Sequence, residues 1–235
     1  MTILANLDRE RLYNEITLSK GAHTAGDAAC LMEMTSLLAG ERHSDNPSCV
    51  CPVITRFAIQ VNDRLPDDLR QMLKPYAPAF IGTRDGQEKQ RREYLANRAV
   101  KVFAPFYLRR AKMEAEAARL EALADNDWAA NRAACDEVRR KVTADFNAAA
   151  FAAADAYDAA FAAASAAAAA FAADADADAD AAFAAAATTD ATYGAAKSAL
   201  VAIMPLIIET FDALILIGAD KRVARPVGVI LPVGA

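Results

Sequence analysis

Large hydrophobic residues recur every three or four positions through most of this chain, the spacing that places them on one face of an α-helix. Val53, Ile54, Phe57 and Val61 are one such set. Strand-like alternation is nearly absent, and segment 12–18 is compatible with either a short strand or a turn of helix. The pattern therefore predicts an all-α fold, a bundle of helices.

Capping residues, glycines and prolines mark the ends of the predicted helices. Thr24 and Asp27 form a capping-box pattern ahead of a helix over 28–38, which Gly40 ends. The polar segment 41–51 predicts a loop.

Prolines punctuate the next part of the chain. Pro52 suits the first position of a helix, and segment 66–68 begins another. Pro75 and Pro78 are expected to kink or end that second helix. Its predicted buried stripe is Leu69, Met72, Leu73, Tyr76 and Phe80.

A basic segment follows, and we expect it to be helical. Asp85 and Glu88 form a second capping-box pattern at its start. Segment 111–123 predicts a charged surface helix, and 125–127 ends it and caps a helix that begins near Trp128. The side chains expected to point inward from the basic helix are Leu95, Val102, Phe103 and Phe106, with its Arg and Lys pointing outward.

The helix from Trp128 is predicted to continue through an alanine tract. About two-thirds of residues 147–187 are Ala, the strongest helix former. Widely spaced aromatic residues fall on one side of this helix, so that side needs a neighbouring surface. The predicted interface residues are Phe151, Tyr157, Phe161, Phe171 and Phe183.

Segment 199–218 has the length and hydropathy of a membrane span, but Pro205, Glu209 and Asp212 interrupt it. We therefore expect a buried core helix that Gly218 ends. Together the elements predict three parts: a compact helical domain over 1–123, a long Ala-rich helical hairpin over 124–218, and a tail over 219–235.

Charge is unevenly distributed along the chain. The formal net charge of −5 disfavours a general nucleic-acid-binding protein. Residues 84–112 hold nine Lys or Arg against three acids, whereas residues 145–190 hold eight Asp and no cation. The two blocks either dock on each other or face separate partners. The N-terminal residues show no signal-peptide pattern, so a cytoplasmic location with reduced thiols is expected.

Candidate chemistry is concentrated in segment 23–51, which holds both histidines and three of the four cysteines. The candidate ligand-binding residues are His23, Cys30, Glu33, His43 and Asp45. The candidate catalytic residues are Glu41, His43, Asp45 and Cys51, and the candidate metal ligands are His23, His43, Cys49 and Cys51.

Several interpretations of this segment stay open. Two thiolates and two imidazoles would suit zinc, although the spacing matches no common zinc finger. Cys49 or Cys51 with His43 as base would suit nucleophilic catalysis. The remaining interpretation is structural, with Asp45 or Ser44 capping a turn and the thiols acting as small buried side chains.

The same segment resembles a group of uncharacterised bacterial and bacteriophage proteins. The shared pattern is Gly-Ala-His, Cys-x-Met-Glu, Ala-Gly-Glu-x-His-Ser-Asp-x-Pro-x-Cys and Pro-Val. Here its letters fall on Gly21, Ala22, His23, Cys30, Met32, Glu33, Ala39, Gly40, Glu41, His43, Ser44, Asp45, Pro47, Cys49, Pro52 and Val53. The resemblance covers about residues 17–83 and implies an Ala-rich helical C-terminal half, but no activity.

The expected function is that of a non-enzymatic helical binding or assembly protein, phage-encoded and acting on a host or virion component. Its expected partners are a protein or a second copy, with neither a membrane nor nucleic acid, and no cofactor is expected. One alternative is a small-molecule enzyme or metal-binding protein with a pocket at the loop of His23, His43 and Cys51. A second is nucleotide or nucleic-acid binding through the basic helix 84–112.

Overall fold

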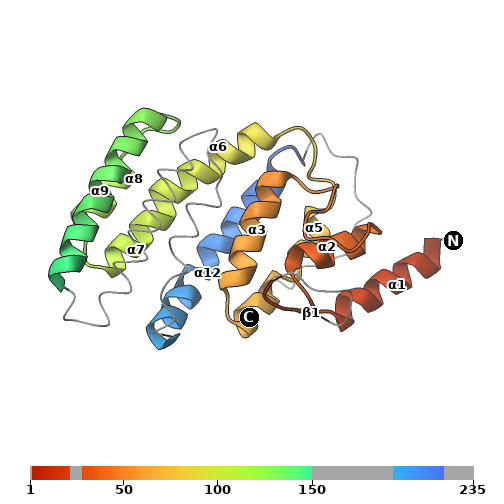
Figure 1. Cartoon of the computed structure of the whole chain (residues 1–235). Helices are drawn as coiled ribbons and strands as arrows, with labels where there is room; N and C mark the ends of the chain where they lie inside the picture. The colour runs from red at the N-terminus through yellow and green to blue at the C-terminus, as the bar shows by residue number, and fades with distance from the viewer. Residues whose placement is uncertain (1, 22–27, 150–192, 220–235) are drawn as a thin grey trace. The chain divides into compact units, whose positions relative to one another are not determined.

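The computed structural model describes residues 2–21, 28–149 and 193–219, and Figure 1 shows the course of the chain. Among the residues it describes, 71% are helical and the sheet consists of two short parallel strands. The predicted all-α fold is therefore confirmed.

The chain forms two compact units, residues 1–91 with 211–235 and residues 92–210. The expected boundaries after residues 123 and 218 stay predictions, because segments 150–192 and 220–235 lie outside the described residues. The predicted interface residues Phe151, Tyr157, Phe161, Phe171 and Phe183 lie there too.

The first unit is built from short helices and one two-residue parallel ladder. Segment 12–18 combines the end of a helix with a strand. Thr17 pairs with Ala28 and Leu18 with Ala29. The elements are α1 (Thr2–Glu15), β1 (Thr17–Leu18), β2 (Ala28–Ala29), α2 (Leu31–Ala39), α3 (Pro52–Arg64), α4 (Asp67–Arg70), the 3₁₀ turn η1 (Gln71–Leu73) and α5 (Tyr76–Phe80).

Helix α2 begins later than the sequence pattern predicts. Its N-cap is Cys30, whose Sγ accepts a hydrogen bond from the Glu33 backbone N–H at 3.4 Å. In return the Glu33 carboxylate accepts from the Cys30 N–H at 2.7 Å. The expected helical start at residue 28 is wrong, because residues 28 and 29 form β2. Gly40 ends the helix as predicted, with a left-handed φ of 76°.

Phe211 lies at the centre of the first unit's core. Its ring centroid is 4.9 Å from that of Phe57, 5.0 Å from Tyr76 and 5.3 Å from Phe80. Leu69, Leu73, Tyr76 and Phe80 are buried as predicted. Met72 is 47% exposed, so its predicted place in the stripe is wrong. The tighter 3₁₀ turn that contains Met72 changes the angle between successive side chains.

The second unit contains a basic helix that is interrupted by a π-helical segment. The elements are α6 (Glu88–Arg98), the π segment η2 (Ala99–Phe103), α7 (Ala104–Arg110), α8 (Glu114–Glu121), α9 (Trp128–Ala149) and α12 (Tyr193–Leu216); the start of α6 and the end of α12 belong to the first unit. The residues expected to point inward, Leu95, Val102, Phe103 and Phe106, are only half-buried. The buried positions are Ala96, Val100, Ala104, Tyr107 and Leu108 instead. Ala96, Val100, Ala104 and Leu108 recur every four residues before and after the π segment, so the residues expected to point inward lie on a different face of the same helix.

Helices α8 and α9 lie side by side and run antiparallel (Figure 1). Glu116 bonds Lys141, and the Arg119 guanidinium lies 2.7 Å from the Glu137 carboxylate. Asp127 caps α9 as predicted, because its Oδ1 accepts from the Ala130 N–H at 3.2 Å.

Helix α12 has an 18-residue window, Ala199–Leu216, that is long and apolar enough to cross a membrane, with a mean hydropathy of 2.1. Only 39% of this window is buried. Both acids in it have partners within their own unit. Arg98 lies 2.6 Å from Glu209, and the Tyr76 hydroxyl donates to Asp212 at 2.9 Å. Its buried side chains are Ala199, Ile203, Met204, Ile207, Thr210, Phe211 and Leu214.

Candidate functional site

The polar loop, which we define as residues 41–51, is organised around the Glu41 carboxylate. Glu41 accepts hydrogen bonds from the Ser48 N–H at 2.7 Å, the Ser48 hydroxyl at 2.8 Å and the Cys49 N–H at 3.0 Å. Burial raises the pKa of Glu41, but these hydrogen bonds outweigh burial and hold the pKa below its ordinary value. The negative charge of this candidate catalytic residue therefore stabilises the conformation of the loop.

The run His43-Ser44-Asp45 does not form a triad of side chains. The Ser44 hydroxyl accepts from the Asn46 N–H at 3.1 Å, and the Ser44 N–H donates to the Ser36 hydroxyl at 3.1 Å. The Asp45 residue is exposed. These contacts are those of a turn that is fastened to α2.

Three of the candidate ligand-binding residues do come together. The Cys30 and Glu33 capping pair lies beside His43, whose Nε2 is 3.8 Å from Glu33 Oε1. Glu33 is 2% exposed, and His43 Nε2 is buried without a hydrogen-bond partner among the described residues. Asp45 is not among these contacts, and His23 lies outside the described residues. The cluster is thus an imidazole next to a buried carboxylate.

Burial keeps the thiols of Cys30, Cys49 and Cys135 protonated. It raises the pKa of Cys30 and of Cys135 to about 12, and that of Cys49 to about 11 with help from the Glu41 charge. Nucleophilic attack requires the thiolate, so the raised pKa of Cys49 opposes that role for this candidate. Cys51 is fully buried, and its backbone N–H donates to Thr83 Oγ1 at 3.1 Å.

No cluster of three or more His, Cys, Asp or Glu suited to a metal ion occurs within the part of the chain that the structure describes. A tetrahedral zinc site built from the four candidate ligands would include His23, which lies outside the described residues. Cys49 instead joins two loops, since its carbonyl accepts from the Gly82 N–H at 3.0 Å and the Arg84 N–H at 3.2 Å.

Arg91 forms a buried hydrogen-bonded node that the sequence pattern does not predict. Its side chain is 0% exposed, and its guanidinium grips both carboxylate oxygens of Asp85 at 2.6 and 2.7 Å. It also donates to the carbonyls of Thr83 at 2.8 Å, Leu214 at 2.9 Å and Ile217 at 2.5 Å. All five N–H donors of the guanidinium are therefore satisfied.

This node corrects two expectations. The sequence pattern places Arg91 on the outward face of the basic helix, but the side chain is fully buried. The pattern also makes Asp85 a cap of that helix, and its Oδ1 does accept from the Gln87 N–H at 3.2 Å. Its main partner, however, is Arg91, which holds the loop at 83–85 against the C-terminal end of α12. No local sequence signal marks that contact.

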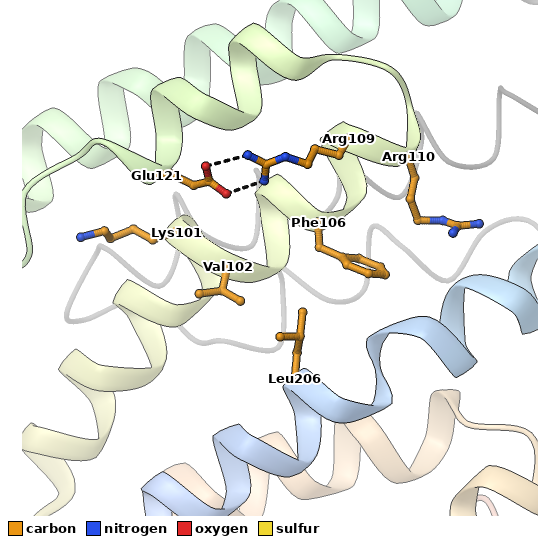
Figure 2. Close-up of a pocket in the computed structure, with 7 residues that line it drawn as sticks. All are labelled: Lys101, Val102, Phe106, Arg109, Arg110, Glu121 and Leu206. Carbon is orange, nitrogen blue, oxygen red and sulfur yellow. Dashed lines mark hydrogen bonds and ion pairs between the residues drawn. The ribbon is translucent and has the colours of Figure 1, made fainter.

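The second unit contains a basic pocket of about 480 Å³ (Figure 2). The π segment contributes two of its lining residues, α7 contributes three, and α8 and α12 contribute one each. The lining residues are Lys101, Val102, Phe106, Arg109, Arg110, Glu121 and Leu206. The basic block at 84–112 is the sequence signal for this region, but it does not predict a pocket.

The charges of the pocket are paired and partly exposed. Arg109 forks onto Glu121, with Nη2 2.7 Å from Oε2, and its Nε lies 3.3 Å from Glu114. This fork lowers the pKa of Glu121 below its ordinary value. Lys101 lies 2.6 Å from Asp125. Arg109 and Glu121 are 42% and 40% exposed, so water competes with both.

Comparison with protein-family models, with curated proteins and with solved structures finds no match to this chain. The resemblance seen in segment 21–53 accordingly remains an expectation. Several residues of its pattern have folding roles in this structure, including the capping pair Cys30 and Glu33, the helix end at Gly40 and the loop anchor Glu41.

Proposed function

We propose that the protein is a non-enzymatic helical binding or assembly protein that acts through its helix surfaces on a protein partner or a second copy. The observation that carries this proposal is that the reactive groups of the polar loop take part in structural contacts. Glu41 holds backbone N–H groups, and the thiol of Cys49 is kept protonated. Groups engaged in this way support folding better than catalysis.

Two exposed apolar positions of α12, one in each unit, give the proposal sites to test. Val201 is 50% exposed and Leu216 is 69% exposed, whereas large side chains on the other side of this helix are buried. A contiguous exposed apolar patch is what marks a contact with another molecule, and these two positions are where α12 can be tested for one. The expected setting is the bacterial cytoplasm, with a host or virion component as partner.

The enzyme alternative rests on His43 and Glu33. A buried carboxylate next to an imidazole is an arrangement used in acid–base chemistry. It lacks a nearby activated nucleophile among the described residues, because burial raises the pKa of Cys30 to about 12. We therefore rank it below the binding function.

Sedimentation velocity of the full chain over a wide concentration range, with a pulldown from bacterial lysate, tests the proposal. Val201→Asp and Leu216→Asp should weaken association or partner capture. Ala133→Asp adds the same charge at an exposed position of α9 and should leave both unchanged. A strict monomer that retains no partner, or equal effects of all three variants, would contradict the proposal.

A further inference from the structure

We propose that the basic pocket of the second unit binds a small organic anion with an apolar body, such as a medium-length fatty carboxylate. Its volume of about 480 Å³ lies within the range of small-molecule sites, roughly 300–1,000 Å³. This site is independent of the surface proposed above and goes beyond that function.

The lining suits an anion that has an apolar body. Val102, Phe106 and Leu206 supply apolar surface, as Figure 2 shows. The charged lining residues are Lys101, Arg109 and Arg110, against the single acid Glu121. Asp125 and Glu114, which lie outside the lining, also pair with Lys101 and Arg109, so a ligand must exchange with these acids. An Arg guanidinium is the side chain best shaped to bind a carboxylate through two parallel hydrogen bonds.

Glu121 acts as an internal competitor for that carboxylate. It occupies the fork of Arg109, which an incoming carboxylate would need. Both side chains are about two-fifths exposed, and ion pairs of this kind contribute little to stability. An anionic ligand can therefore take the place of Glu121 without disturbing the fold.

The backbone at the pocket is unusual in a way that supports a site. Lys101 and Val102 both belong to the π segment Ala99–Phe103. Short π segments interrupt the regular hydrogen bonding of a helix and occur frequently at functional sites. Here the segment places two adjacent residues, one cationic and one apolar, on the lining of the same cavity.

Fluorescence titration of the full chain with anilinonaphthalene sulfonate, itself an organic anion with an apolar body, tests the proposal. We expect saturable binding that octanoate reverses and that neutral octanol does not. Glu121→Gln should tighten probe binding severalfold, because it frees the fork of Arg109. Arg109→Gln should weaken probe binding severalfold.

Glu137→Gln is the matched control, because it removes a carboxylate that pairs with Arg119 and does not line the pocket. It should leave probe affinity unchanged. Far-UV circular dichroism tests whether each variant is folded. If Arg109→Gln does not fold, the affinity of Glu121→Gln for the probe decides the proposal. Equal affinities of Glu121→Gln and Glu137→Gln, or displacement of the probe by octanol as well as by octanoate, would overturn the proposal.

Discussion

The first and second units each contain an arginine that forks onto a carboxylate, and the two pairs differ in burial. Arg91 and Asp85 are 0% and 5% exposed, whereas Arg109 and Glu121 are 42% and 40% exposed. The buried arginine also binds three backbone carbonyls. The exposed one lines a cavity instead.

This difference shows that the same chemical pair serves different purposes. A buried fork that loses one partner leaves an uncompensated charge, so the loss of either partner strongly destabilises the fold. An exposed fork loses little when broken, because water solvates both groups. The Arg91 node is therefore part of the fold, and the Arg109 fork is available for exchange with a ligand.

Replacing the buried arginine should have the largest effect on stability. Arg91→Met would leave Asp85 buried without its partner and would free three carbonyls. We expect the free energy of unfolding to fall by about 3–5 kcal/mol, measured by urea denaturation. Arg109→Met is the matched control and should cost less than about 1 kcal/mol. Similar losses in both variants would remove the distinction between the two pairs.

Thiol labelling tests whether the polar loop of the first unit protects the Cys49 thiol in the folded protein. The pKa of Cys49 is raised from 9.0 to about 11. At a given pH below 9 the native thiolate fraction is then on the order of a hundredfold lower than that of an unshifted thiol. Alkylation of Cys49, followed by mass spectrometry of the folded and urea-unfolded chain, should show this difference. Equal rates in both states would contradict it.

The raised pKa of the Cys49 thiol also determines how stability changes at alkaline pH. The contribution of Cys49 to stability is complete below its ordinary pKa and is lost as pH rises through the folded value of about 11.

Glu41→Gln should weaken the loop by an intermediate amount. The variant keeps one oxygen acceptor but loses the charge that binds Ser48 and Cys49, at a cost of about 1–2 kcal/mol. Because the pKa of Glu41 is lowered, its contribution is present above the ordinary glutamate value and is lost as pH falls through the folded value. Urea denaturation should therefore show that the free energy of unfolding falls less between neutral and acidic pH in Glu41→Gln than in the unmodified protein.

Asp45→Asn removes an exposed carboxylate of the same loop and serves as the control. Its stability should follow that of the unmodified protein at both pH values. If Asp45→Asn and Glu41→Gln behave alike, the hydrogen bonds of Glu41 do not anchor the loop.

The smallest stability change is expected at the pocket, where function should respond instead. Glu121→Gln should alter the free energy of unfolding by less than about 1 kcal/mol, because the pair with Arg109 is exposed. Thermal unfolding of the variant measures this directly. A large loss of stability would show that the fork is part of the fold, as the Arg91 node is.

Local signals predict the helical fold and several element ends well. Gly40 ends α2, Pro52 begins α3, and Asp127 caps α9. The candidate cluster is partly predictable too, since Cys30, Glu33 and His43 do meet. The role of Cys30 as a helix cap is not predictable from the sequence, because the usual capping residue has a short oxygen-bearing side chain.

The errors in burial have two different causes. Met72 lies in a 3₁₀ turn, and Val102 and Phe103 lie in the π segment. The 3₁₀ turn changes the angle between successive side chains, and the sequence pattern carries no marker of where it begins. In the basic helix the buried stripe Ala96, Val100, Ala104 and Leu108 runs regularly through the π segment, and the error is the choice of the face that carries the larger side chains.

The sequence by itself determined the helical class, several helix ends and the separation of basic from acidic blocks, because these depend on neighbouring residues. Only the tertiary structure decided which arginine is buried and which lines a pocket. Arg91 binds carbonyls 123 and 126 positions away, at Leu214 and Ile217. The burial of a charge depends on such distant partners, and their arrival cannot be inferred from the spacing of nearby residues.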